Sequence, residues 1–172
     1  MPETDKTDSP MGNAGAAWAL LAIVLLLGKA IYRLALRAVE ALQMELGLMH
    51  WGVLAGWVFF MAYCEGYRGF QKSFSPRTAA RIHHLRVNPT ILHCVLAPVF
   101  VMGFFYATRR TKIVAWALLF GIGLLVFLVS LMSQPWRGII DAGVVVGLTW
   151  GVVSLVWMTF RPVSVSPELP VD

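Results

Sequence analysis

The chain has 172 residues, of which 58% are hydrophobic and only 13% are charged, and its mean hydropathy is +0.71. A soluble domain carries about 25% charged residues, so this composition excludes an ordinary soluble protein and indicates one solvated by lipid. The formal charge of +5 does not indicate nucleic-acid binding, because the Lys and Arg residues fall at the ends of apolar runs, where basic side chains anchor membrane helices at anionic headgroups.

Apolar runs separated by polar segments predict five membrane spans. These spans cover residues 14–36, 47–63, 90–108, 113–132 and 138–160. Segments 37–46 and 76–87 have a basic face and are predicted to be surface helices. The polar ends, 1–13 and 162–172, contain proline and are predicted to be disordered tails. The expected fold class is therefore an all-α integral membrane protein, with residues 14–161 forming one domain, a bundle of about five transmembrane helices.

The first span runs into a stripe of charged residues at helical spacing. Its members are Lys29, Arg33, Arg37 and Glu40. This spacing is typical of an amphipathic helix at the membrane surface. It fits either the end of a membrane helix, which is the commoner case, or a site that binds lipid headgroups.

The third span contains Pro98, which removes a backbone hydrogen bond and kinks a helix. A re-entrant or interfacial segment, leaving four spans, is the alternative here. With five spans the Lys and Arg residues divide evenly between the two membrane faces, whereas four spans divide them ten to four. With five spans, the acidic first residues and the tight basic turn at 109–112 favour an N-terminus outside, and the four-span alternative reverses this orientation. We expect a multi-pass protein of the bacterial inner (plasma) membrane.

A long polar passage, residues 65–89, follows the second span. Its first part is predicted to be a loop. Ser75 and Pro76 form a helix start signal, with serine as N-cap and proline at the first helical position, and Asn88-Pro89 is a stop signal.

Alternation of five spans places this loop and the starts of the third and fifth spans at one membrane face. The titratable residues collected there form a candidate polar site, which comprises Glu65, Arg68, His83, His84, His93, Arg137 and Asp141. A carboxylate inside an apolar helix costs a few kcal/mol unless it is paired. We expect Arg137, one turn before Asp141, to pair with it and, with Trp136, to lock the helix start, the alternative being a proton or substrate role. Glu65 either pairs with Arg68 or acts as a general base.

The same face carries further residues with possible ligand chemistry. Cys64 and Cys94 could form a disulfide if this face is oxidising, and are otherwise buried thiols. No pair among the histidines, cysteines and Glu65 has the spacing of a known metal motif, so neither a metal nor a cofactor is predicted. His50 and His93 are expected at opposite faces, which excludes axial ligation of one haem iron.

The fifth span contains small residues at every fourth position, Gly143, Gly147 and Gly151. Such a stripe permits close approach of another helix. The expected partner is internal, such as the fourth span at Gly121 and Gly123, or else another membrane protein.

The function expected from these features is a non-catalytic accessory or assembly subunit that binds lipid, through anionic headgroups, or a protein partner. The alternative is a small membrane enzyme or permease for an anionic substrate, with Arg68, Lys72 and Arg137 binding it and Glu65 or Asp141 handling protons. The absence of a recognisable nucleophile or phosphate-binding pattern favours the non-enzymatic function.

Overall fold

The computed structural model describes residues 10–102 and 109–161, and every regular element in these two ranges is a helix. Helix α1 (Pro10–Leu42) is followed by α2 (Leu48–Met61), the π-helix η1 (Ala62–Phe74) and α3 (Ser75–Val87). Two short helices, α4 (Ile91–Val95) and α5 (Ala97–Val101), come next. The remaining helices are α6 (Arg109–Ser130) and α7 (Trp136–Phe160).

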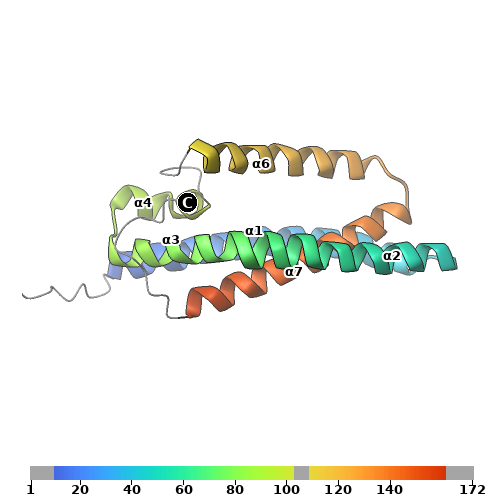
Figure 1. The fold of residues 1–172 in the computed structure, drawn as a ribbon, viewed down its shortest axis with the longest axis horizontal. Helices are drawn as coiled ribbons and strands as arrows, with labels where there is room; N and C mark the ends of the chain where they lie inside the picture. Colours follow the sequence, from blue (N-terminus) through green and yellow to red (C-terminus); the bar gives the residue numbers. More distant parts are fainter. Residues whose placement is uncertain (1–9, 103–108, 162–172) are drawn as a thin grey trace, which may run out of the picture.

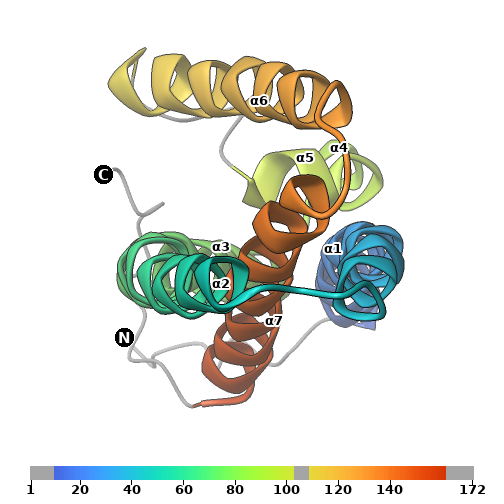
Figure 2. The same cartoon turned by 90° about the vertical axis from the view of Figure 1, so that its right-hand side faces the viewer.

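Helix α7 is the centre of the bundle. It packs between α1 on one side and the continuous helix α2–η1–α3 on the other (Figure 2). The contacts fix the directions: Gly138, near the start of α7, lies on Ala41 near the end of α1, whereas Gly12, near the start of α1, lies on Arg86 of α3. Helix α1 is therefore antiparallel to both of the others. Helices α4 and α5 cover α1 and α3 near the start of α1 (Figure 1).

The bundle interior is built from small and polar residues. Many of the buried positions are alanine, glycine, serine or threonine, and Ser75 of α3 meets Ser154 of α7 with 2.9 Å between the hydroxyl oxygens. Large apolar side chains point outward on every long helix, as Leu48 (92% exposed), Phe120 (70%) and Phe160 (72%) illustrate. Small residues let helix backbones approach closely, and the wide apolar surface is left to the surroundings.

Two of the predicted boundaries do not match the structure at the start of the chain. The predicted span 14–36 and surface helix 37–46 form one uninterrupted helix, and the predicted tail is helical from Pro10 onward. No proline interrupts the segment after Pro10, and the rows of alanine and leucine favour helix, so nothing in it stops the helix before Leu42. Residues 1–9 and 162–172, the other predicted tail positions, lie outside the described residues.

The loop predicted after the second span was wrong, because residues 62–74 are helical. Proline cannot donate a hydrogen bond, and its ring clashes with the carbonyl of the fourth residue before it. Directly before Pro76 the hydrogen bonds follow the wider π register, with the Ser75 N–H bonded to the Phe70 carbonyl. The chain therefore passes through Ser75-Pro76 as one helix, although these two residues resemble a helix start.

The third predicted span is broken. Helices α4 and α5 each have five residues and meet at Leu96, two residues before Pro98. The last part of that prediction, residues 103–108, lies outside the described residues. Two helices of the described chain, α1 and α7, are long and apolar enough to cross a membrane. This gives weak support to a membrane protein and does not confirm five spans.

Helix α6 runs beside the bundle but is separated from it over most of its length (Figure 1). A Cβ atom built on Gly121 or Gly123 would meet no other atom within 4 Å. These two glycines are therefore not the partners of the glycine stripe on α7.

The close contact between α1 and α7 can be tested at Gly138. A Cβ atom at this position would lie 2.6 Å from the Arg37 backbone carbonyl oxygen, so one helix must shift. We expect Gly138→Ala to lower the free energy of unfolding by about 1–3 kcal/mol. The matched control Gly123→Ala should be neutral or stabilising by up to about 1 kcal/mol, because alanine favours helix. Denaturant titration of both variants in detergent measures the difference, and equal effects would contradict the packing.

Candidate functional site

The predicted polar site is divided among three levels of the bundle. Arg137 and Asp141 lie towards the end where α7 starts. Glu65 lies beside Gly147, which is about 15 Å along α7 from Arg137 and about 9 Å from Asp141. His84 and His93 lie towards the opposite end, on α3 and α4. The separation arises because the chain continues straight through η1 and α3 after Tyr63 instead of turning back. The expectation that these residues share one level was therefore wrong.

Asp141 is 4% exposed. Its Oδ2 atom accepts no hydrogen bond from the described residues, and the charged group that acts on it is Arg37 of α1. Arg137, the expected partner, instead donates from Nη1 to the Ser130 carbonyl at 3.3 Å. Arg37 acts on Asp141 only because α1 and α7 pack together, and the two side chains form no ion pair in the described structure, so their spacing in the sequence gave no sign of this electrostatic effect.

The start of α7 is held by Gln134, which the sequence reasoning missed. Its amide nitrogen donates to the Arg37 carbonyl at 3.2 Å, and its amide oxygen accepts the Gly138 N–H at 3.0 Å. The Trp136 ring lies 4.9 Å from the His50 ring, at the start of α2. These contacts join α1, α2 and α7 at one end of the bundle.

Glu65 faces the glycine stripe. A Cβ atom on Gly147 would lie 2.7 Å from Glu65 Oε2, which accepts no hydrogen bond from the described residues. Arg68, its expected partner, is exposed and forms no ion pair with it in the described structure. The other two stripe glycines, Gly143 and Gly151, contact the rings of Trp57 and Phe70. The stripe is therefore covered by α2 and η1 of the same chain.

The π-helix sets which side chains reach α7. Glu65, Phe70 and Ser75 are five residues apart, and they contact Gly147, Gly151 and Ser154 in turn. An α-helix turns by about 100° per residue, so positions five apart would not stack on one face. In a π-helix the backbone hydrogen bonds join residues five apart, and this wider turn places Glu65, Phe70 and Ser75 on one face. A search for α-helical or strand periodicity cannot find this spacing.

The buried basic and histidine side chains at the far end support the fold. Arg81 is 2% exposed and donates from Nη1 to the Phe100 carbonyl at 3.2 Å. His93 stacks on the Phe100 ring with centroids 4.6 Å apart. His84 is also buried, and His83 is half-buried. Arg81 and Phe100 thus tie α3 to α5.

The two cysteines are free thiols. Cys94 lies against Gly15 and donates to the Met11 carbonyl at 3.7 Å, whereas Cys64 lies in η1 beside the middle of α7. A disulfide requires Cα atoms about 4.4–6.8 Å apart. The long helix between Cys64 and the end of α3 separates the two thiols, so this fold does not form the disulfide that the sequence offered.

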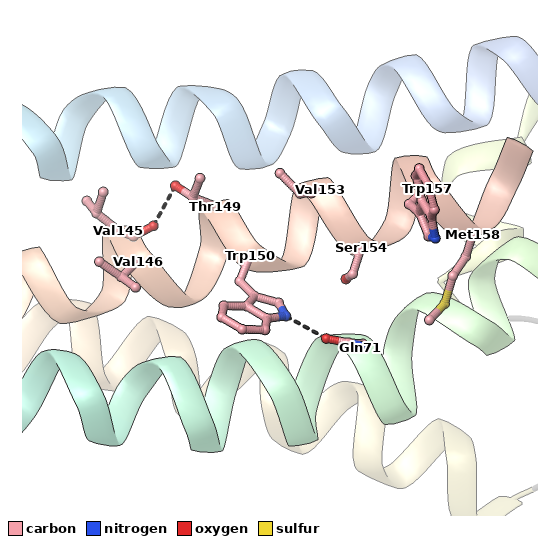
Figure 3. A pocket seen from close by; sticks show the side chains of 9 residues that line it. All are labelled: Gln71, Val145, Val146, Thr149, Trp150, Val153, Ser154, Trp157 and Met158. Atoms are coloured by element: carbon pink, nitrogen blue, oxygen red, sulfur yellow. Dashed lines mark hydrogen bonds between the residues drawn. The ribbon is translucent and has the colours of Figure 1, made fainter.

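A groove of about 650 Å³ runs along α7 next to η1 (Figure 3). Its lining is Gln71, Val145, Val146, Thr149, Trp150, Val153, Ser154, Trp157 and Met158. One polar contact crosses it, where the Trp150 indole N–H donates to the Gln71 side-chain oxygen at 2.7 Å (Figure 3). The lining holds no ionisable acid or base. The described residues also contain no group of three potential metal ligands.

Comparisons with protein-family models, curated proteins and solved structures found no match to this chain. The functional argument therefore depends on the geometry of the chain itself.

A double-mutant cycle tests the position of Asp141. We expect Arg37→Gln and Asp141→Asn to be coupled by about 0.5–1 kcal/mol in the free energy of unfolding, as neighbouring charges are. Arg137→Gln and Asp141→Asn should add independently, because the Arg137 guanidinium is directed to Ser130. Denaturant titrations of the single and double variants provide both coupling energies. Coupling through Arg137 rather than Arg37 would contradict the structure.

Proposed function

We propose that this chain is a multi-pass helical membrane protein that acts as a non-catalytic accessory or assembly subunit, binding lipid or a protein partner. The observation that carries the proposal is the distribution of side chains, with small and polar residues inside the bundle and large apolar residues outside. In water, broad exposed apolar surfaces are binding sites or aggregation liabilities. In lipid they cost nothing, and close packing through small residues is the usual way to hold helices together.

The broken third segment favours the four-span form of this architecture. Helices α4 and α5 are too short to cross a hydrocarbon core of about 30 Å, and they lie against α1 and α3 near one end of the bundle. Helix α6 then returns along the bundle to the start of α7 (Figure 1). In this arrangement α1, α2–η1–α3, α6 and α7 cross the membrane, and α4–α5 form the interfacial segment.

The distribution of basic residues sets the orientation of the four-span form. The bundle end at which α3 and α7 finish, and at which α6 starts, carries Arg86, Arg109, Arg110, Lys112 and Arg161. The opposite end carries Arg33, Arg37 and Arg137. Because Lys and Arg concentrate on the cytoplasmic side of membrane proteins, we place the end with α3 in the cytoplasm. We retain the bacterial inner membrane as the location.

The non-catalytic function is supported by the dispersion of the reactive groups. Glu65 lies on η1 beside Gly147 and Asp141 lies nearer the start of α7, Arg68 is exposed, and Arg137 is directed to a backbone carbonyl. An enzyme or permease needs such groups to converge on a shared pocket, and the groove beside α7 contains none of them. The separated helix α6 leaves apolar surface for lipid or for a partner helix.

Cysteine labelling tests the four-span form. In a chain carrying Cys64→Ser and Cys94→Ser, we expect single cysteines introduced by Asn88→Cys and Arg109→Cys to react with a membrane-impermeant maleimide from the same side. Ser133→Cys should react from the other side. Five spans would place positions 88 and 109 on opposite sides, so that result would contradict the proposal.

Complementation of a deletion strain tests the non-catalytic function. We expect the double variant Glu65→Gln/Asp141→Asn, present in the membrane at the wild-type level, to restore the wild-type phenotype to the deletion strain. Both substitutions keep the side-chain shape and remove only the ionisable groups. Immunoblotting of the membranes controls for abundance. A variant that accumulates normally but fails to complement would favour the enzyme or permease.

A further inference from the structure

The outward face of η1 and the start of α3 carries cations and aromatic rings. Its members, here called the cationic stripe, are Tyr63, Tyr67, Arg68, Lys72 and Arg77. We propose that the cationic stripe binds the headgroup of an anionic phospholipid, while one of its acyl chains lies in the groove beside α7. This inference rests on the proposed membrane location and names the ligand class.

The π-helix creates the stripe. Because Glu65, Phe70 and Ser75 face α7 at intervals of five, residues between them are turned outward. Tyr63, Arg68, Lys72 and Arg77 are exposed, and they follow one another at intervals of four or five residues. The cations therefore line up on successive turns of one face.

Two of the cations are held in place. The Lys72 ammonium lies 4.7 Å from the centre of the Tyr67 ring, and Tyr67 stacks on Tyr63 with ring centroids 5.9 Å apart. The Arg77 guanidinium donates to the Ser73 carbonyl at 2.8 Å and to the Ser73 hydroxyl at 2.7 Å. Both cations retain further N–H groups for an outside acceptor, since an ammonium has three and a guanidinium five.

The stripe has no internal counter-ion in the described part of the chain. Arg68, Lys72 and Arg77 form no ion pair there, and Glu65, the nearest acid in sequence, faces Gly147 on the opposite side of η1. Exposed cations beside a membrane span are costly unless they meet an anion. Phosphate oxygens supply one: Arg77 lies nearest the headgroup level, and Lys72 and Arg68, roughly one and two turns deeper along η1, meet the phosphate through local thinning of the bilayer.

The adjoining groove argues for a phospholipid in place of an acidic protein segment. Gln71 borders the groove and directly precedes Lys72, so the apolar and cationic surfaces adjoin. The groove follows α7 from Val145 to Met158, about 20 Å along the helix axis. This length covers the half of a ~30 Å hydrocarbon core nearest the end of α7. An apolar groove that begins near mid-membrane and runs alongside cations has the form of a lipid site.

The binding can be measured by native mass spectrometry of the full chain, released from nanodiscs containing palmitoyl-oleoyl phosphatidylglycerol and phosphatidylcholine. We expect phosphatidylglycerol to bind more tightly, and the triple variant Arg68→Gln/Lys72→Gln/Arg77→Gln to lose about 100-fold of that preference, at roughly fivefold per cation. The matched control Lys29→Gln/Arg33→Gln/Arg109→Gln removes three exposed cations elsewhere and should retain the preference. Glycerol phosphate, which lacks acyl chains, should not compete.

Three outcomes would overturn the lipid site: equal binding of the two lipids, equal losses in the triple variant and its control, or a co-purifying acidic protein that depends on the three cations without any lipid preference. Extraction of the membranes with alkaline carbonate distinguishes failure of the lipid-site proposal from failure of the membrane-protein proposal. A chain released by carbonate is not integral, so the membrane proposal fails. A chain that stays in the membrane but binds both lipids equally contradicts the cationic stripe alone.

Discussion

The close approach of α7 to α2 and η1 is the interaction on which the rest of the structure depends. Three glycines at four-residue intervals leave room for Trp57, Glu65 and Phe70, and a serine pair continues the same contact into α3. Without Cβ atoms the helix backbones come close enough for dispersion contacts along their length. This matters in lipid, where the hydrophobic effect does not drive helices together.

The same contact brings a polar passage into the bundle. Residues 62–87 have Glu65, Phe70 and Ser75 against α7 and much of their positive charge outside. The apolar first half of α1 lies beside basic α3, and its basic second half lies beside the start of α7, as the contacts of Gly12 with Arg86 and of Gly138 with Ala41 and Arg37 show. Charge is therefore present at both ends of the bundle but on different helices. The site that we propose for anionic headgroups lies on one of these faces.

The helical class and the last two long helices could be predicted from the sequence. The spans predicted at 113–132 and 138–160 differ from α6 and α7 by only a few residues, because both are long apolar runs with clear breaks. The positions of the candidate site residues could not be predicted. The predicted cluster depended on treating residues 65–75 as a loop, whereas the segment is helical. The five-residue spacing of Glu65, Phe70 and Ser75 has no counterpart in α or β periodicity, and Ser75-Pro76 has the composition of a helix start. Once η1 is helical, Glu65 lies away from Arg137 and Asp141, and the charged group that acts on Asp141 is Arg37 of α1.

Cross-linking of α3 to α7 tests the central packing most directly. Ser75 and Ser154 have hydroxyl oxygens 2.9 Å apart, so the sulfur atoms of the pair Ser75→Cys/Ser154→Cys would lie within reach of each other. In a chain carrying Cys64→Ser and Cys94→Ser, we predict rapid disulfide formation on mild oxidation in native membranes, and little with Ser73→Cys/Ser154→Cys, because Ser73 is directed to Arg77. Absence of the bridge at position 75, or equal cross-linking at position 73, would show that η1 and α3 do not pack on α7 in this register.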